Sequence, residues 1–356
     1  MSEVPLIPTP SMAPPARSVL PPTMSPAAPA SPRESPTPEP SPTPTPTAFV
    51  QLSLDRETRV EGARVMGWSP DGGVIAVTTN RGVALIDAAS LGELAFKATE
   101  YGQRPLGFSE DGARLATADG LELGRSFRVW EARDLALLGE YSLPGPGDFG
   151  TSAMKLGFLT DDEIVLAVGE LSGLGVWITA PDGSMNHVLT IEGAEPLMAA
   201  LSPSSDMVAV SVGPAQAVRV WRLRTDEMLE EVPVEGSPEL QITGDGRFLV
   251  AMLGSTVVWD LAAGRSIVEI PVSDGIAANH RIPYSVAISH DDRLLASDTE
   301  IPAPGVGIWE LATGELAGML AHEELERIVQ ISFSPANHEL ALLLNDGRLQ
   351  VWRIGD

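Results

Sequence analysis

Two sequence markers recur along most of this chain with a regularity that unrelated elements would not produce. An apolar residue followed by Trp occurs six times, and Leu85-Ile86 holds the same place in the first copy. The six pairs are Val129-Trp130, Val176-Trp177, Val220-Trp221, Val258-Trp259, Ile308-Trp309 and Val351-Trp352. Successive copies lie about 44 residues apart, a period typical of supersecondary units that stack on their neighbours.

The second marker is a turn-forming cluster upstream of each pair. Each cluster opens with Ser or Thr and continues with residues such as Pro, Asp and Gly. Pro presets φ, Asp bonds to its own backbone, and Gly accepts positive φ, so these residues favour tight turns. The clusters begin at Ser69, Ser109, Thr160, Ser202, Thr243, Ser289 and Ser334.

Short apolar runs beside the turns indicate strands. Val74 to Val77, Ile164 to Val168 and Phe248 to Met252 are four or five residues long and rich in β-formers. No helical 3.6-residue period extends between them. Four short strands per repeat indicate a propeller blade. Seven copies therefore predict an all-β fold, a seven-bladed β-propeller over residues 49–356.

The repeats resemble those of the WD40 β-propeller family, in particular its divergent, bacterial-type members. The best copy is Leu240 to Ile270, where TGDG, FLVAM, VVWDL and AAGRSIVEI follow in the family's order. Asp260 completes a Trp-Asp dipeptide there, whereas Glu131 and Arg222 replace the Asp elsewhere. The resemblance implies a non-enzymatic protein-interaction scaffold with no catalytic residue, metal or cofactor. It leaves open whether the hydrogen-bond network that braces the family's blades is formed.

The two ends of the predicted ring suggest how it closes. The last repeat stops at Val351 to Gly355, just after its third strand. Near the start of the domain, Val50, Leu52 and Leu54 alternate with polar residues, which is the pattern of a half-buried strand. Residues 49–54 are therefore predicted to complete the last blade and so to remove an exposed edge.

Loop lengths predict a partner-binding face. Insertions at Gly145 to Thr151, Ser273 to Tyr284, Asp119 to Ser126 and Thr299 to Gly305 fall in connections that share one face in the resembled family. Arg and aromatic residues are over-represented at binding hot spots. The alternative, that long loops merely tolerate insertion, stays open. The candidate partner-binding residues are Tyr101, Arg104, Phe149, Asn279, His280, Arg281 and Tyr284.

Residues 1–48 have a different composition from the rest of the chain. They hold 16 of the 31 prolines and 13 Ser or Thr, so they lack the apolar residues that would offset the entropy of ordering. They are predicted to be a disordered, Pro-rich leader that acts as a linker, a stalk or a ligand for proline-recognising domains. The start, MSEVPLIPTP, has no signal-peptide pattern, so the alternatives are a cytoplasmic protein or, with a missing signal, a cell-surface or periplasmic one.

Charge restricts the partners. The formal net charge is -25 at pH 7, which opposes binding to nucleic acid or to acidic membrane surfaces. No apolar run reaches the 18 residues of a membrane span, and the chain contains no cysteine. A monomeric propeller with a protein or peptide partner of unknown identity is therefore expected.

A second functional hypothesis is a propeller hydrolase or small-ligand binder with its site at the mouth of the central channel. The predicted inner strands RVMGW, RPLGF, MKLGF, LMAAL, ELQIT, SVAIS and VQISF argue against it, because they are mainly apolar and carry no ligand set. The acidic clusters at Asp161 and His290 fall at turn positions, where Asp is a turn former.

Overall fold

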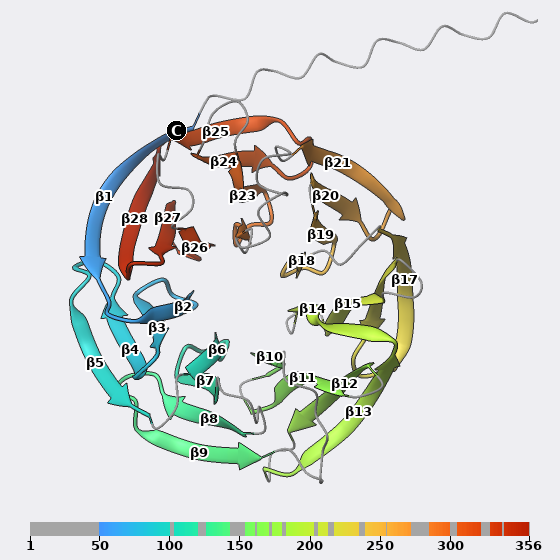
Figure 1. Cartoon of the computed structure of the whole chain (residues 1–356), viewed down its shortest axis with the longest axis horizontal. Coiled ribbons are helices and arrows are strands. Elements are labelled where there is room, and N and C mark those ends of the chain that lie inside the picture. The colour runs from blue at the N-terminus through green and yellow to red at the C-terminus, as the bar shows by residue number, and fades with distance from the viewer. Residues whose placement is uncertain are drawn as a thin grey trace, which may run out of the picture. The chain divides into compact units, whose positions relative to one another are not determined.

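The described part of the chain forms seven four-stranded antiparallel sheets arranged in a ring (Figure 1). The chain divides into two units, Met1–Pro46 and Thr47–Asp356, and everything described belongs to the second. The predicted leader, residues 1–48, lies outside the described residues. The computed structural model describes residues 50–99, 103–119, 126–142, 154–160, 162–170, 173–179, 183–202, 206–212, 217–234, 239–253, 255–271, 285–299, 305–321, 328–336 and 338–355.

All secondary-structure elements in these ranges are strands, which confirms the predicted all-β, seven-bladed fold. A search of the same residues for a helix long and apolar enough to cross a bilayer finds none. We call each sheet a blade and letter its strands a to d from the centre of the ring outward.

The first four blades follow chain order. Blade one is β2 (Ala63–Trp68), β3 (Val74–Thr79), β4 (Gly82–Asp87) and β5 (Glu93–Ala98). Blade two is β6 (Gln103–Phe108), β7 (Arg114–Asp119), β8 (Ser126–Glu131) and β9 (Leu137–Ser142). Blade three is β10 (Met154–Phe158), β11 (Ile164–Glu170), β12 (Gly173–Thr179) and β13 (Met185–Glu192). Blade four is β14 (Ala194–Ser202), β15 (Met207–Val212), β16 (Ala217–Arg222) and β17 (Glu227–Pro233).

The last blade takes its outer strand from the other end of the domain. Blade five is β18 (Glu239–Ile242), β19 (Phe248–Leu253), β20 (Ser255–Asp260) and β21 (Arg265–Pro271). Blade six is β22 (Val286–Ile288), β23 (Leu294–Thr299), β24 (Gly305–Glu310) and β25 (Leu316–Ala321). Blade seven is β26 (Ile328–Phe333), β27 (Glu339–Leu344), β28 (Arg348–Gly355) and β1 (Gln51–Arg59).

Burial is greatest in strands b and c because neighbouring blades cover both of their faces. Every residue of β27 is buried, so its sequence ELALLL is nearly continuous in apolar residues rather than alternating. In contrast, β5 is exposed at five of its six positions. Apolar runs therefore mark strands b and c, and polar strands mark the rim.

The core consists of seven separate clusters, one at each blade interface. Alternate residues of a strand serve opposite interfaces, since successive side chains point to opposite faces. In β3, Ile75 packs with Leu343 and Val351 of blade seven, whereas Ala76 packs with Leu115 of blade two. The other five clusters join blades two to three, three to four, four to five, five to six, and six to seven.

Blade seven is closed by the antiparallel pairing of β1 with β28. Leu52 lies opposite Ile354, and the pairing continues to Arg59 opposite Arg348. The register shifts between Leu54 and Arg56, so the strand extends beyond the predicted 49–54 segment after a bulge. Leu52 packs toward blade six, but Leu54 is among the exposed large apolar residues. The alternation read from the sequence thus holds only as far as Leu52.

The β1 strand also contacts the two neighbouring blades. Val50, the residue just before β1, donates its N–H to the Ala317 carbonyl of blade six at 2.6 Å. A Cβ on Gly318 would lie 2.8 Å from the Val50 carbonyl oxygen, so glycine permits this approach. On the other side, Arg56 Nε donates to the Ala88 carbonyl of blade one at 2.7 Å, while its guanidinium pairs with Glu339 at 2.9 and 3.0 Å.

Candidate functional site

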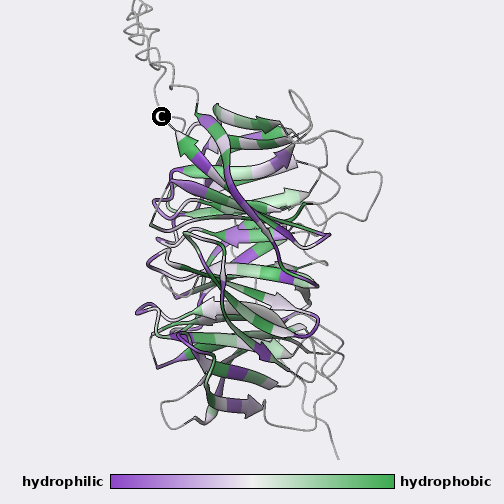
Figure 2. Cartoon of the chain, turned by 90° about the vertical axis from the view of Figure 1, so that its left-hand side faces the viewer, coloured by the Kyte–Doolittle hydropathy of each residue, from purple (hydrophilic) through white to green (hydrophobic). Residues whose placement is uncertain are grey.

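The ring has two faces, and the strand order assigns each connection to one of them (Figure 2). The a–b and c–d turns lie together on what we call the turn face. Backbone hydrogen bonds join the two turns within a blade, for example Ala88 N–H to the Gly73 carbonyl and Leu311 N–H to the Arg293 carbonyl. The b–c and d–a connections lie on the opposite side, which we call the loop face.

The turn clusters found in the sequence are hydrogen-bonded units. The Ser69 hydroxyl donates to Asp71 at 2.6 Å, the same carboxylate accepts the Gly73 N–H, and the hydroxyl oxygen accepts the Val74 N–H. These bonds to the carboxylate lower the pKa of Asp71, the hydroxyl of Ser69 contributing most. The hydroxyl–carboxylate bond recurs in blades two, five and six as Ser109–Asp111, Thr243–Asp245 and Ser289–Asp291.

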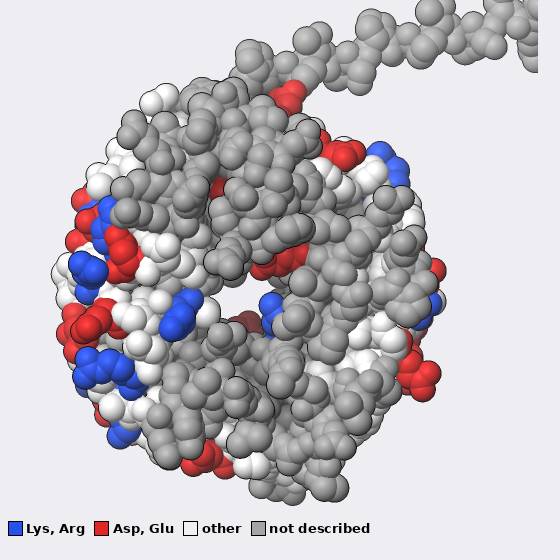
Figure 3. Space-filling view, viewed as in Figure 1, with Lys and Arg blue, Asp and Glu red and all other residues white. Residues whose placement is uncertain are grey.

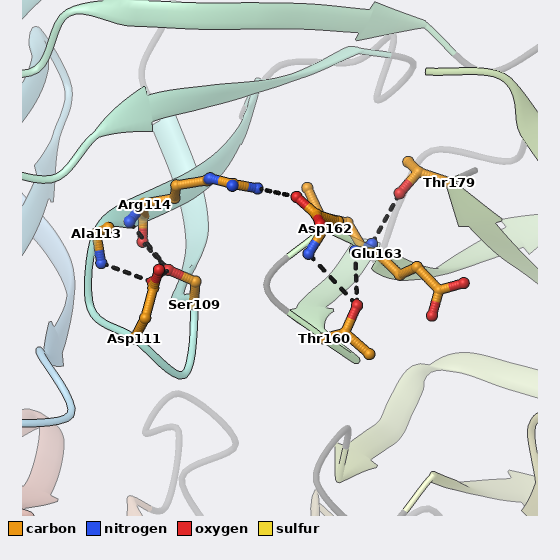
Figure 4. Close-up of polar contacts among 9 residues, drawn as sticks. Ser109, Asp111, Ala113, Arg114, Thr160, Asp162, Glu163 and Thr179 are labelled. Atoms are coloured by element: carbon orange, nitrogen blue, oxygen red, sulfur yellow. Dashed lines mark hydrogen bonds and ion pairs between the residues drawn. The ribbon is translucent and has the colours of Figure 1, made fainter. Parts of the chain in front are cut away.

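Side chains of neighbouring turns also bond to one another. Figure 4 shows Arg114 of blade two reaching Asp162 of blade three, with a nitrogen–oxygen distance of 2.9 Å. Glu163 beside it pairs with Arg224 of blade four at 2.7 Å. Asp162 and Asp291, members of the acidic clusters noted in the sequence, are thus turn and ion-pair residues. Many polar side chains of the turn face therefore form hydrogen bonds or ion pairs within the ring.

The tryptophans of strand c show which blades have a side-chain hydrogen bond from the indole N–H. Trp130 Nε1 donates to the buried Thr117 hydroxyl at 2.9 Å, and Trp352 Nε1 donates to Gln350 at 3.2 Å. Within the described residues, the indole N–H groups of Trp177, Trp259 and Trp309 have no hydrogen-bond partner. A side-chain brace is therefore present in some blades and not in others.

Most of the sequence-predicted partner residues fall outside the described residues. Arg104 lies in β6, and its side chain is not described. For the rest of the predicted set, the structure describes only the strands on either side, such as β9, β10, β21 and β22. Those outside are Tyr101, Phe149, Asn279, His280, Arg281 and Tyr284.

A cluster of charged residues near the channel was not selected from the sequence. Asp298 of β23 is buried and accepts the Ser285 N–H at 3.2 Å, while the Ser285 hydroxyl accepts the Ile331 N–H of blade seven. Burial, assisted by the nearby charge of Glu239 and opposed by backbone hydrogen bonds, raises the pKa of Asp298 to about 7. Burial also raises the pKa of Glu239, against the opposing charge of Lys155.

The signals for this cluster were visible, since Lys155 interrupts MKLGF and Glu239 begins ELQIT. Space-filling shows a central opening bordered by side chains of both charges (Figure 3). A carboxyl group that titrates near neutrality can transfer protons. Yet no group of three or more His, Cys, Asp or Glu within the described residues is arranged to hold a metal ion.

Seven four-stranded blades define a β-propeller, and the hydroxyl–carboxylate turns between strands a and b and the Trp residues of strand c resemble those of WD40 repeats. Known proteins agree with that class. WD repeat-containing protein 3 of Mus musculus is 25% identical over 211 residues, covering 56% of this chain and 21% of the mouse protein. The chain thus spans about a fifth of that relative's length. No family model matches the chain.

A solved structure supports the fold independently. The β-propeller domain of Cps50 (Swd1) from Myceliophteria thermophila superposes with a TM-score of 0.66 at 17% identity. The superposition covers 86% of this chain and 100% of that domain. The chain is therefore a seven-bladed β-propeller that is similar to WD40-repeat proteins, and WD40 propellers are typically protein-interaction scaffolds.

Proposed function

We propose that this propeller is a non-enzymatic scaffold that binds a protein partner on its loop face. The observation that carries the proposal is that polar groups of the turn face are already engaged in hydrogen bonds within the ring. On the turn face, the Asp71, Asp111, Asp245 and Asp291 carboxylates accept bonds from their own turns. A recognition surface needs polar groups and anchors that are not already committed to the fold.

Chain lengths support the same face. The d–a connection between β9 and β10 spans 143–153, and the one between β21 and β22 spans 272–285. The a–b turn between β2 and β3, by comparison, spans only 69–73. Function in repeat folds resides in loops held by a rigid scaffold. The candidate anchors Phe149, Arg281 and Tyr284 all fall in these long connections.

Affinity capture from native extract tests the proposal. The bait is the full chain, compared with the triple variant Phe149→Ala, Arg281→Ala and Tyr284→Ala. A matched triple on the turn face, Glu110→Ala, Arg133→Ala and Glu315→Ala, is the control, since these side chains lie on the turn face. We expect mass spectrometry to find proteins retained by the wild type and the control but lost from the loop-face triple.

The competing function, a small-ligand or hydrolase site at the channel mouth, is favoured by one observation, the neutral-range pKa of Asp298. Asp298→Asn therefore forms a third arm of the same experiment. Binding that survives the loop-face triple but is lost in Asp298→Asn would place the site at the channel and contradict the scaffold proposal. Binding lost only in the turn-face control would contradict both.

A further inference from the structure

A groove lies between blades seven and one, beside the outer strand β5. Its volume is about 350 Å³. Ala84 and Ile86 of β4 line it and are buried, whereas Phe96 of β5 forms one wall and is 41% exposed. An exposed aromatic side chain beside a groove is typical of a surface that binds a partner.

The repeat shows that the fold does not require an aromatic residue at this position. Phe96 lies opposite Ala84, two residues before the strand c anchor Ile86, and every other blade has a corresponding pair. Of the seven residues at this position, Phe96 is the exposed large apolar one. Packing of the propeller therefore does not explain Phe96. The other six blades have Glu57, Glu140, Glu231, Glu269, Thr190 and Met319 there.

A bulge in β5 places a negative charge on the same side of the strand as Phe96. Phe96, which follows the bulge at Leu94, lies opposite Ala84. Glu93, which precedes the bulge, lies opposite Ile86. Residues directly opposite each other in an antiparallel pair share one face of the sheet, so Glu93 and Phe96 both line the groove. Glu93 is exposed and gives the groove an acidic end near the turn face.

The opposite end of the groove, on the loop face, is cationic. Arg59 at the end of β1 and Arg81 in the b–c turn of blade one line it. Arg59 Nε donates to the Asp346 carbonyl at 3.1 Å and forms no ion pair within the described residues. Arg81 pairs with Glu61 at 3.7 Å, but these side chains are 68% and 89% exposed, so a partner's carboxylate can replace Glu61 at little cost. Figure 3 shows Lys and Arg side chains on the left of the loop face, over β1 and blade one.

A corresponding groove between blades four and five has a different lining. Its volume is about 310 Å³. Glu269 takes the place of Phe96 there, opposite Val257 of β20. It is also the one charged residue among the described residues that line this groove. The shape therefore recurs at the rim, whereas the aromatic wall and the two oppositely charged ends belong to the groove of blades seven and one.

We propose that this groove binds an extended segment of a partner protein, with carboxylates at one end, an apolar side chain in the middle and cationic side chains at the other end. The carboxylates pair with Arg59 and Arg81, the apolar side chain packs on Phe96, and the cations pair with Glu93. Arg81 precedes β4, and Glu93 lies opposite its Ile86. At about 3.3 Å per residue, the two charged ends are roughly 17 Å apart, the length of about five extended residues.

Mixed charge also suits the protein as a whole. The net charge of -25 repels a uniformly acidic segment, whereas a segment with both signs is close to neutral and is selected by the local charges of the groove. None of the residues that line the groove belongs to the candidate loop-face set. The groove is therefore a second interaction surface, and it does not depend on the proposed loop-face site.

Fluorescence anisotropy of the labelled peptide Glu-Glu-Gly-Phe-Gly-Lys-Lys, titrated with the full chain at physiological ionic strength, tests the proposal. We expect the wild type to bind it. The dissociation constant of Phe96→Ser should be roughly tenfold higher, because apolar anchors carry much of the binding energy of an interface. Leu137→Ser is the matched control, since Leu137 is also an exposed apolar residue of an outer strand, β9 of blade two, and this variant should bind like the wild type.

Arg81→Glu tests the cationic end. Its control is Arg265→Glu, which has the same net charge and changes an exposed residue of β21 in blade five. We expect Arg81→Glu to bind the peptide roughly tenfold more weakly than this control. A second peptide, in which lysines replace the two glutamates, should bind Arg81→Glu more tightly than the control. This exchange of preference also shows that Arg81→Glu is folded.

Three results would overturn the proposal directly. They are a wild type that does not bind the first peptide, equal binding by Phe96→Ser and Leu137→Ser, and an Arg81→Glu variant that shows no exchange of preference. Self-association of the wild type in sedimentation velocity, weakened by Phe96→Ser but not by Leu137→Ser, would assign the groove to a second copy of this chain and overturn it as well.

Discussion

Two buried threonines of the ring have different hydrogen-bonding situations. The Thr117 hydroxyl accepts the Trp130 indole N–H, whereas the Thr256 hydroxyl has no partner within the described residues. Both side chains are fully buried. A buried donor that loses its acceptor pays its full desolvation penalty, while an unpaired hydroxyl already carries that penalty.

We therefore predict opposite outcomes for the same substitution. Thr117→Val should lower the free energy of unfolding by about 1–2 kcal/mol, because the Trp130 N–H is left buried without an acceptor. Thr256→Val should be neutral or stabilising. Guanidinium unfolding curves of the two variants and the wild type measure the difference, and equal destabilisation would refute the role assigned to Thr117.

Asp298 makes stability depend on pH. Its pKa is raised to about 7 in the folded protein, so the native state binds the proton more tightly than the unfolded chain. The stabilising contribution of the neutral acid is complete below about pH 4, the ordinary value for Asp. It is lost as the pH rises through about 7. The raised pKa of Glu239 acts in the same direction.

The variant Asp298→Asn isolates this effect, because an amide oxygen can still accept the Ser285 N–H. We expect the melting temperature of the wild type to fall between pH 5 and pH 8, and that of Asp298→Asn to fall less and to exceed the wild type at pH 8. Asp71→Asn is the control, since its pKa is lowered and its linkage lies below pH 4. Parallel pH curves for wild type and Asp298→Asn would contradict the assignment.

At the scale of the element, β1 contacts both blades that neighbour its own. Beyond its ladder with β28, it places Arg56 against the buried Glu339 of β27 and against the backbone of blade one. The ion pair of Arg219 with Glu231 joins the adjacent strands β16 and β17 and lies at the exposed rim of blade four. Ion pairs that differ in burial differ in their contribution to stability.

Replacement of each arginine by methionine separates the two cases. Arg56→Met should lower the free energy of unfolding by about 2 kcal/mol, since Glu339 keeps a buried charge without its partner. Arg219→Met should cost less than about 1 kcal/mol. Chemical unfolding at fixed ionic strength measures both, and an effect of Arg56→Met no larger than that of Arg219→Met would exclude a special contribution of β1 to ring closure.

Elements also show where pattern reading succeeds and fails. The Ser or Thr of each turn cluster and the apolar-Trp pairs predicted blade number and strand c, because both are local signals repeated in every blade. The bulge after Leu54 was not predicted, since a register shift depends on the partner strand rather than on alternation within one segment.

At the scale of the whole molecule, contacts between blades limit which side-chain clusters could be predicted from the sequence. Lys155, Glu239 and Asp298 come from blades three, five and six and interact only because the ring brings them together. In the sequence, Lys155 interrupts an apolar strand, whereas Asp298 stands between Ser297 and Thr299 and gives no separate signal. The predicted loop-face set stays a prediction for a different reason, because recognition residues in loops carry no periodic pattern.

Closure through β1 also sets the order of events as the ring forms. The strands β1 and β28 are neighbours in one sheet, although nearly the whole propeller separates them in sequence. A long-range pairing stabilises the fold only after the entropic cost of bringing the two segments together has been met. Among the strand pairings of the described residues, β1 with β28 has the largest separation in sequence. During synthesis, β1 emerges before the other strands of the ring and has no partner until β28 follows. The nascent ring therefore carries an unsatisfied edge strand for most of its time on the ribosome, when strand exchange between copies competes with closure.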